Sequence, residues 1–187
     1  TIFRRLDCIL EPTHEKVLEA YKKYKKELKD LTGVLTKASG VMFYNTSKYT
    51  FQKLLNDPGN IKENFIDYLN GYSDNIQEII NKFKFRNEVQ NLFEKGLLYQ
   101  VVKKFTDPAI DLHPNTITNH EMGYVFEELI RKYNEATNEN PGEHFTPREI
   151  IHLMVNLLLS KDQKKLSQKG VITTVYDPAC GTGGMLA

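Results

Sequence analysis

Apolar side chains recur at the three- and four-residue spacing of amphipathic helices along most of the first 134 residues. One stripe begins after Thr13 and runs from Val17 to Leu31, with lysines on the opposite face. Another begins behind Asn60, which has Glu63 three residues later, the spacing of a capping box. These patterns predict an all-α region.

Further helices are predicted towards the middle of the chain. A short one is expected from Ser47 to Leu55, and Asp74 begins another with isoleucines behind it. The apolar series from Val89 to Phe105 is long enough for two helices, and Gly96 divides it.

The helical pattern ends in a polar stretch that suits a domain boundary. Thr118 and Glu121 have capping-box spacing, and the stripe behind them predicts a helix to Tyr133. The adjacent Glu127 and Glu128 are expected to be surface charges, because neighbouring side chains diverge on a helix. Residues 134–142 are polar and end in Pro-Gly. We therefore expect a helical domain over residues 1–134 and a second domain over 135–187.

The second region changes from a helical to an α/β pattern. Thr146, Pro147 and Glu149 have the order of a cap, a first-turn proline and an acidic third position. The helix behind them, through Leu159, is apolar on most sides, so we expect it to be buried, as helices flanking a parallel sheet are. A charged loop, 161–169, leads to the alternating run Val171–Val175, which predicts a β-strand. The predicted fold is mainly α, with the start of an α/β domain.

Composition narrows the possible partners. Lys and Arg number 25 and Asp and Glu 24, so a net charge of +1 gives no field-scale reason for nucleic-acid or membrane binding. Two cysteines and no long apolar run favour a reducing compartment and no membrane span. The histidines have no metal-ligand spacing, so no metal site is predicted.

A glycine-rich turn follows the predicted strand, and it reads Asp177-Pro178-Ala179-Cys180-Gly181-Thr182-Gly183-Gly184. No lysine follows the glycines, which excludes a P-loop, and the dinucleotide fingerprint fits poorly because Leu186 stands at its third glycine position. An acid before the glycines repels a pyrophosphate and can accept hydrogen bonds from an ammonium group or hydroxyls. S-adenosylmethionine is such a ligand. Cys180 is interpreted as a small residue packed in the turn, in preference to a thiol nucleophile.

Four segments together resemble a known family. The glycine turn resembles the cofactor motif of amino-group DNA methyltransferases, and Gly142-Glu143-His144-Phe145-Thr146-Pro147 resembles their other cofactor motif, which precedes the turn in one circularly ordered branch. The segments 4–13 and 120–130 extend the likeness to nearly the whole chain. The chain is thus similar to the modification subunit, HsdM, of type I restriction–modification systems.

The resemblance implies an N-terminal helical domain followed by a Rossmann-like, S-adenosylmethionine-dependent domain. It implies that Asp177 binds the methionine amine of the cofactor and that Phe145 lines the site. The residues that the resemblance places at the cofactor are Glu143, His144, Phe145, Thr146, Pro147, Arg148, Asp177, Pro178, Gly181, Thr182, Gly183 and Gly184. His144 is equally well read as a solvent-facing loop residue.

The implied reaction is methyl transfer to the exocyclic amine of adenine, flipped out of duplex DNA. The catalytic Asn/Asp-Pro-Pro-aromatic loop of the family is not in these 187 residues and is expected after Ala187, so we expect a fragment of a longer protein that is inactive alone. The implied partners are a specificity subunit, a restriction subunit and a second modification subunit, in a prokaryotic cytoplasm. Two alternatives stay open: a non-catalytic assembly and DNA-clamping module, and a methyltransferase of the same branch that acts on protein or RNA.

Overall fold

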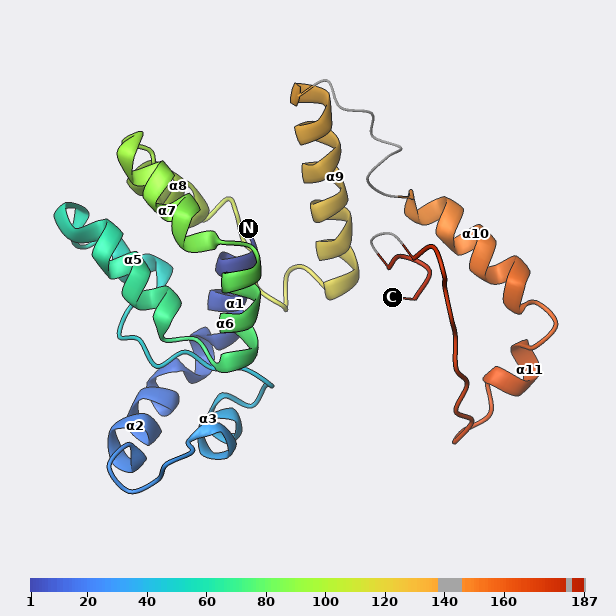
Figure 1. Ribbon diagram of the computed structural model, residues 1–187, viewed down its shortest axis with the longest axis horizontal. Coiled ribbons are helices and arrows are strands. Elements are labelled where there is room, and N and C mark those ends of the chain that lie inside the picture. The colour runs from blue at the N-terminus through green and yellow to red at the C-terminus, as the bar shows by residue number, and fades with distance from the viewer. Residues whose placement is uncertain (138–145, 181–182, 187) are drawn as a thin grey trace. The chain divides into compact units, whose positions relative to one another are not determined.

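The computed structural model describes residues 1–137, 146–180 and 183–186. The chain divides into two compact units, Thr1–Asn119 and His120–Ala187. Helices predominate, and the described residues contain no β-strand (Figure 1), which confirms a mainly α chain. Within the described residues, no helix combines the length and the apolar character needed to cross a membrane.

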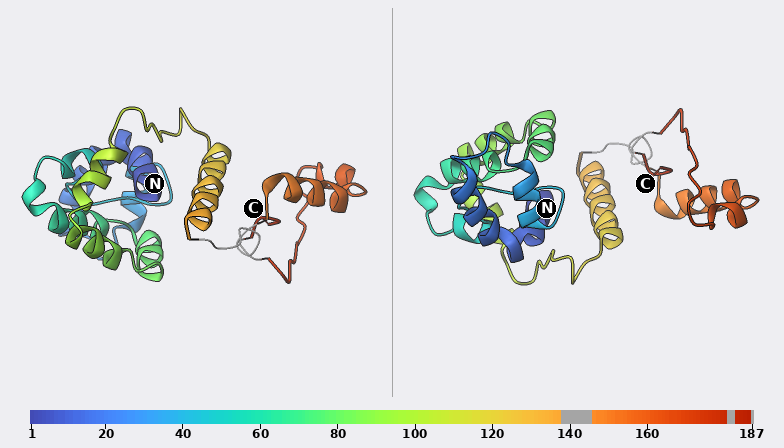
Figure 2. Two further views of the ribbon diagram at one scale, coloured as in Figure 1. Left: turned by 90° about the horizontal axis from the view of Figure 1, so that it is seen from above. Right: turned by 90° about the horizontal axis from the view of Figure 1, so that it is seen from below.

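Eight α-helices make up the first unit (Figure 2). They are α1 (Ile2–Leu10), α2 (His14–Tyr24), α3 (Thr32–Ser39), α4 (Phe51–Leu54), α5 (Ile61–Asn70), α6 (Asp74–Lys82), α7 (Phe85–Glu94) and α8 (Leu98–Phe105). Short 3₁₀ turns, Glu11–Thr13 and Pro58–Asn60, precede α2 and α5.

Local signals placed several of these helices correctly. Helices α5 and α6 begin at or next to the predicted caps. Gly96, with φ +68°, separates α7 from α8 as predicted, in the left-handed region that glycine adopts without steric cost.

Two predicted helices are shorter than expected. Helix α2 ends at Tyr24 and not near Leu31, and a separate helix, α3, begins at Thr32, whose amide donates to the Asp30 carboxylate (2.8 Å). The helix expected from Ser47 spans only Phe51–Leu54, because the Thr50 hydroxyl caps it by accepting from the Lys53 amide.

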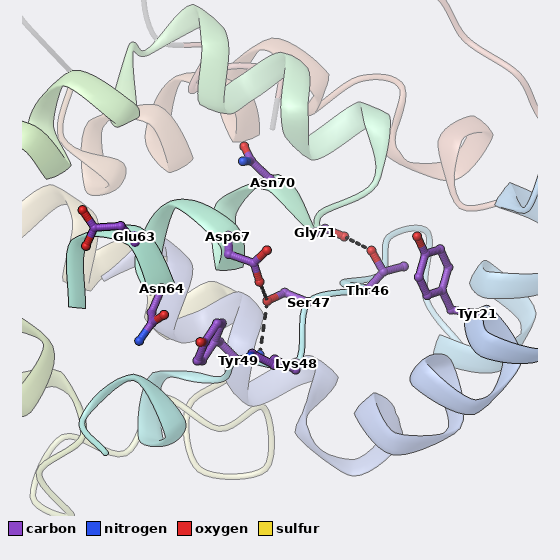
Figure 3. Close-up of a pocket in the computed structure, with 10 residues that line it drawn as sticks. All are labelled: Tyr21, Thr46, Ser47, Lys48, Tyr49, Glu63, Asn64, Asp67, Asn70 and Gly71. Atoms are coloured by element: carbon purple, nitrogen blue, oxygen red, sulfur yellow. Dashed lines mark hydrogen bonds between the residues drawn. The ribbon is translucent and has the colours of Figure 1, made fainter. Parts of the chain in front are cut away.

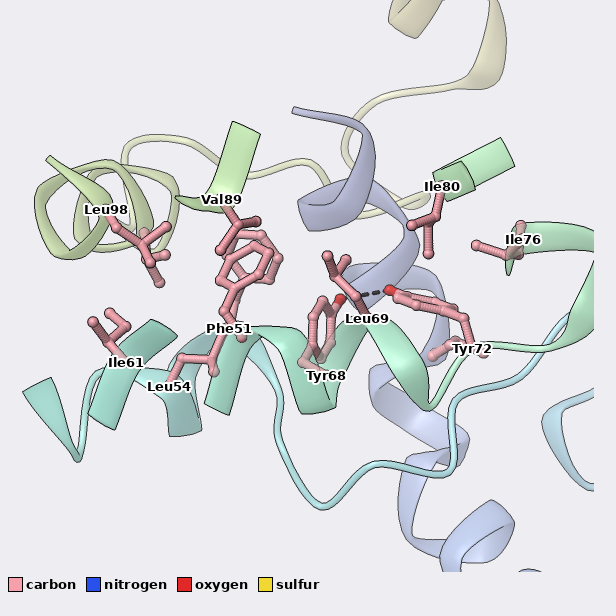
Figure 4. Close-up of a cluster of buried hydrophobic side chains, with 13 residues drawn as sticks. Phe51, Leu54, Ile61, Tyr68, Leu69, Tyr72, Ile76, Ile80, Val89 and Leu98 are labelled. Carbon is pink, nitrogen blue, oxygen red and sulfur yellow. Dashed lines mark hydrogen bonds between the residues drawn. The ribbon is translucent and has the colours of Figure 1, made fainter. Parts of the chain in front are cut away.

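Helix α5 supplies the centre of the core (Figure 4). The Tyr68 ring lies edge-on to Phe51, with ring centroids 5.6 Å apart, and to Tyr72, at 5.3 Å. The hydroxyls of the two tyrosines hydrogen-bond to each other, so these buried rings keep a polar partner. Aliphatic side chains from six helices join the cluster: Leu10, Leu54, Ile61, Leu69, Ile76, Ile80, Val89, Leu98 and Val102.

Buried polar side chains fix the loop before α4 against the end of α5. Asn45 donates to the Tyr68 carbonyl (3.0 Å) and accepts from the Ser47 amide (2.8 Å). The Thr46 amide donates to the Gly71 carbonyl (2.8 Å). These bonds satisfy backbone groups that would otherwise be buried without partners.

Arg5 joins α1 to the segment that leads out of the first unit. Its side chain is 6% exposed in total and donates to the carbonyls of Leu112 (2.7 Å) and Ile117 (2.8 Å) and to Asn119 Oδ1 (2.9 Å). The last residues of this unit are therefore tied to its first helix.

The second unit contains α9 (Asn119–Thr137, whose first residue closes the first unit), α10 (Arg148–Leu159) and α11 (Gln163–Leu166). The sequence placed the domain boundary between residues 134 and 135, which lie inside α9, and that boundary as a functional division stays a prediction. Helix α11 lies inside the stretch expected to be a charged loop.

Two expectations about this unit are wrong for the described residues. Residues 171–175 have no regular secondary structure, because a strand exists only when a neighbouring strand accepts and donates its backbone hydrogen bonds. Helix α10, expected to be buried, contains no buried residue, and Leu157 and Leu158 are 67% and 69% exposed. Both differences follow from the absence of a sheet among the described residues.

Candidate functional site

The first predicted cofactor segment leads into α10. Pro147, with ψ 142°, is still extended, and its carbonyl accepts from the amides of Ile150 and Ile151 (3.1 Å each). The helix therefore begins at Arg148, one residue later than the predicted capping by Thr146, which is exposed. Glu149 lies in the first turn, where the negative charge of a carboxylate interacts favourably with the helix dipole.

Arg148 turns back from the start of α10 towards α9. Its Nε donates to Glu127 Oε1 in an ion pair, and its guanidinium lies 5.3 Å from the centre of the Tyr124 ring. The two charged side chains are only 30% and 25% exposed. Glu127 was expected to be a surface charge and instead joins two helices.

The second predicted segment forms a compact turn around Asp177 and the glycines. Asp177 Oδ1 accepts from the Ala179 amide (3.0 Å), which fixes the carboxylate at the head of the turn. Gly183 has φ +81°, and its amide donates to the Cys180 carbonyl (2.7 Å). Cys180 is exposed and not packed in the turn as expected.

The two segments meet where the glycine turn touches α10. A Cβ built on Gly184 would lie 2.4 Å from Ile151 Cδ1, so a side chain at Gly184 would require Ile151 to move. Ile151 lies three residues after Arg148, and the contact thus brings the turn against the first turns of α10. The hydrogen bond of Asp177, by contrast, stays within its own turn.

Five of the predicted cofactor residues lie outside the described residues: Glu143, His144, Phe145, Gly181 and Thr182. Thr146, Pro147, Asp177 and Pro178 are described, and all but Asp177 are exposed.

A separate polar cavity of about 550 Å³ lies on the first unit, between α2, α5 and the loop before α4 (Figure 3). Ser47 donates to Asp67 Oδ2 (2.6 Å) in its wall, beside Tyr49 and Lys48. None of the cofactor residues that the structure describes lines it.

Two family matches cover the two parts of the chain. Residues 1–105 match the family described as HsdM N-terminal domain, and residues 117–187 match N-6 DNA Methylase. The first match covers more than half of the chain. This chain belongs to the HsdM family.

Its relatives are methylase subunits of type I restriction enzymes. The EcoEI methylase subunit of Escherichia coli is 34% identical over 102 residues, which are 54% of this chain and 18% of that protein. The HindI subunit of Haemophilus influenzae is 30% identical over 81 residues, 43% of this chain and 16% of the relative. The MpnII subunit of Mycoplasma pneumoniae is 34% identical over 65 residues, 35% and 11% respectively.

The chain therefore spans less than a fifth of the length of these HsdM relatives. No solved structure matches it significantly.

Proposed function

We propose that this HsdM-family chain is part of an enzyme that transfers a methyl group from S-adenosylmethionine to the exocyclic amine of adenine in duplex DNA. The observation that carries the proposal is the contact of Gly184 with Ile151, because it joins the two segments that resemble the cofactor motifs. The match to N-6 DNA Methylase over residues 117–187 supports the reaction class.

Two features of the described residues support such a cofactor site. Gly183 adopts a left-handed backbone, and no atom lies within 4 Å of the position its Cβ would take, so a ligand could approach the backbone closely at this residue. The Asp177 carboxylate, held by the Ala179 amide, is suited to accept hydrogen bonds from the cofactor ammonium. Bound S-adenosylmethionine would supply an activated methyl group. Thr146 and Pro147 would contribute backbone groups, and Glu143, His144, Phe145, Gly181 and Thr182 complete the proposed set.

We further propose that catalysis needs residues after Ala187, with the target adenine flipped out of the duplex. The proposed partners are DNA, a specificity subunit, a restriction subunit and a second modification subunit, in a prokaryotic cytoplasm. Residues 1–134 would serve assembly and clamping on DNA, and residues 135–187 would begin the methyltransferase domain. The relatives described above, all methylase subunits of type I restriction enzymes, support this proposal.

The decisive experiment measures cofactor binding by calorimetry in the full-length protein. Asp177→Ala is expected to abolish binding of S-adenosylmethionine with the helical unit still folded. Asp177→Asn is the matched variant, because an amide oxygen can still accept from the Ala179 amide while the charge is lost. Unchanged affinity in both variants would contradict the role of Asp177, and unmodified protein that binds no S-adenosylmethionine would overturn the proposed function.

A further inference from the structure

Arg148 is seated on α9 by three features of that helix. Glu127 accepts from its Nε, the Tyr124 ring lies beneath its guanidinium at 5.3 Å, and Gly123 lies directly beside it. Glu127 and Arg148 are 21 positions apart, so the contact joins two helices.

Gly123 makes room for the guanidinium. A Cβ built there would lie 2.0 Å from Arg148 Nη2 and 2.6 Å from Cζ, distances that no real contact allows. Glycine inside a helix costs about 1 kcal/mol relative to alanine, and nothing about a surface helix calls for it at this position. The seat for Arg148 is a physical reason for its presence.

The neighbouring basic side chains of α9 form ion pairs with carboxylates other than Glu127. Arg131 pairs with Glu128 and Glu135, and Lys132 also approaches Glu128 (3.9 Å). The ring of Tyr124 covers one face of the guanidinium, which lowers the local dielectric and strengthens a charge-assisted hydrogen bond. The pair is more shielded than an ordinary surface ion pair, whose contribution to stability is small.

We propose that Arg148 is a positioning residue, whose guanidinium anchors the start of α10 in the Gly123–Tyr124–Glu127 seat and thereby fixes the Thr146–Pro147 segment for cofactor binding. This inference rests on the proposed function. It assigns Arg148 a contact with the protein, whereas the sequence motif alone places it among cofactor residues. The three residues of the seat lie on α9, before both cofactor motifs in the sequence. Helix α9 would therefore hold the cofactor site in place without contacting the cofactor.

The test uses the full-length methylase with its partner subunits. Arg148→Gln, Glu127→Gln and Gly123→Ala are each expected to raise KM for S-adenosylmethionine about tenfold and to leave kcat within about twofold, because the chemistry is untouched. The double variant Arg148→Gln/Glu127→Gln is expected to be no worse than either single variant, since both remove one interaction. Arg148→Lys is expected to recover part of the loss. Arg131→Gln, which removes only exposed ion pairs on the same helix, is the control and is expected to change nothing.

Hydrogen exchange of the Ile150 and Ile151 amides supplies a readout that is independent of the cofactor. Exchange at these first-turn amides is expected to quicken in Glu127→Gln and not in Arg131→Gln.

An increase in KM confined to Arg148→Gln, with Glu127→Gln and Gly123→Ala unaffected, would overturn the inference in favour of a direct cofactor contact. Equal exchange rates in Glu127→Gln and Arg131→Gln would also overturn it. Failure of the unmodified protein to bind S-adenosylmethionine is a different result: it removes the proposed function, and with it any cofactor role for the seat.

Discussion

Asp7 on α1 is the most strongly perturbed carboxyl group of the first unit. It is 7% exposed, and its carboxylate accepts hydrogen bonds from Arg4 Nη1 (2.9 Å) and from the Phe51 amide (3.3 Å). Burial raises the pKa of Asp7 to about 6, and the charge of Arg4 and the Phe51 hydrogen bond only partly oppose this. The carboxyl is therefore more acidic in the unfolded chain than in the folded one.

This difference predicts a pH dependence of stability. Between about pH 4 and 6 the unfolded state releases the Asp7 proton and the folded state keeps it, so the free energy of unfolding falls as pH rises through this range. The total fall in the free energy of unfolding across this range is about 3 kcal/mol. Other carboxyl groups titrate in the same range, so the diagnostic quantity is the difference between the unmodified chain and Asp7→Asn in urea unfolding at a series of pH values. Parallel curves for the two proteins would contradict the assignment.

Gly71, at the end of α5, has no room for a side chain. A Cβ there would lie 2.2 Å from Asn45 Oδ1 and 2.4 Å from the Ser47 backbone nitrogen. Gly71→Ala is expected to lower the free energy of unfolding by about 2 kcal/mol or more, because the loop before α4 must move.

Gly59→Ala is the matched control, since the nearest atom to its Cβ is Asp57 Oδ1 at 3.8 Å. Its expected change is within about 1 kcal/mol, in either direction. Equal urea midpoints for the two variants would show that the loop before α4 moves at little cost, and would contradict the prediction for Gly71→Ala.

At the scale of helices, some helix boundaries follow from local sequence signals and others do not. The starts of α5 and α6 and the break at Gly96 follow local signals, and the sequence was enough to find them, although neither helix has a side-chain capping hydrogen bond. The starts of α3 and α4 are marked by hydrogen bonds of Asp30 and Thr50, within apolar patterns that would also fit longer helices. Periodicity alone does not distinguish these cases.

The Arg5 contacts predict a measurable link between α1 and residues 112–119. Arg5→Met keeps much of the side-chain length and leaves the Leu112 and Ile117 carbonyls without their donor, so a loss of about 3 kcal/mol is expected. Lys104→Met, at an exposed ion pair with Asp107, is the control and is expected to change stability little. Hydrogen exchange of the amides in 112–119 should increase only in Arg5→Met, and an unchanged pattern would contradict the link.

At the scale of the whole molecule, the two units differ in how much they bury. The first holds a core of aromatic and aliphatic residues, whereas the hydrophobic side chains of α10 remain open to solvent. The candidate site was predictable in its glycine turn and its Thr-Pro helix start, because those signals are contiguous. The Glu127–Arg148 pair was not, because no local pattern connects residues 21 positions apart.

The exposed face of α10 predicts that this 187-residue chain binds a hydrophobic dye. Leu157 and Leu158 are each more than two-thirds exposed, and a contiguous apolar patch is a site for such binding. Leu157→Gln/Leu158→Gln is expected to reduce dye fluorescence and to leave the unfolding midpoint of the first unit unchanged. Dye binding equal to that of the unmodified chain would place the apolar surface elsewhere.

Arg5 also constrains the order of events during synthesis. Its acceptors at Leu112 and Ile117 lie 107 and 112 positions later in the chain, and Arg4 donates to the Phe105 carbonyl across 101 positions. At a translation rate of about 5–20 residues per second, the acceptor carbonyls of Phe105, Leu112 and Ile117 are made several seconds or more after α1. Helix α1 is thus made well before residues 105–117, and its hydrogen bonds to them form only after that segment has emerged.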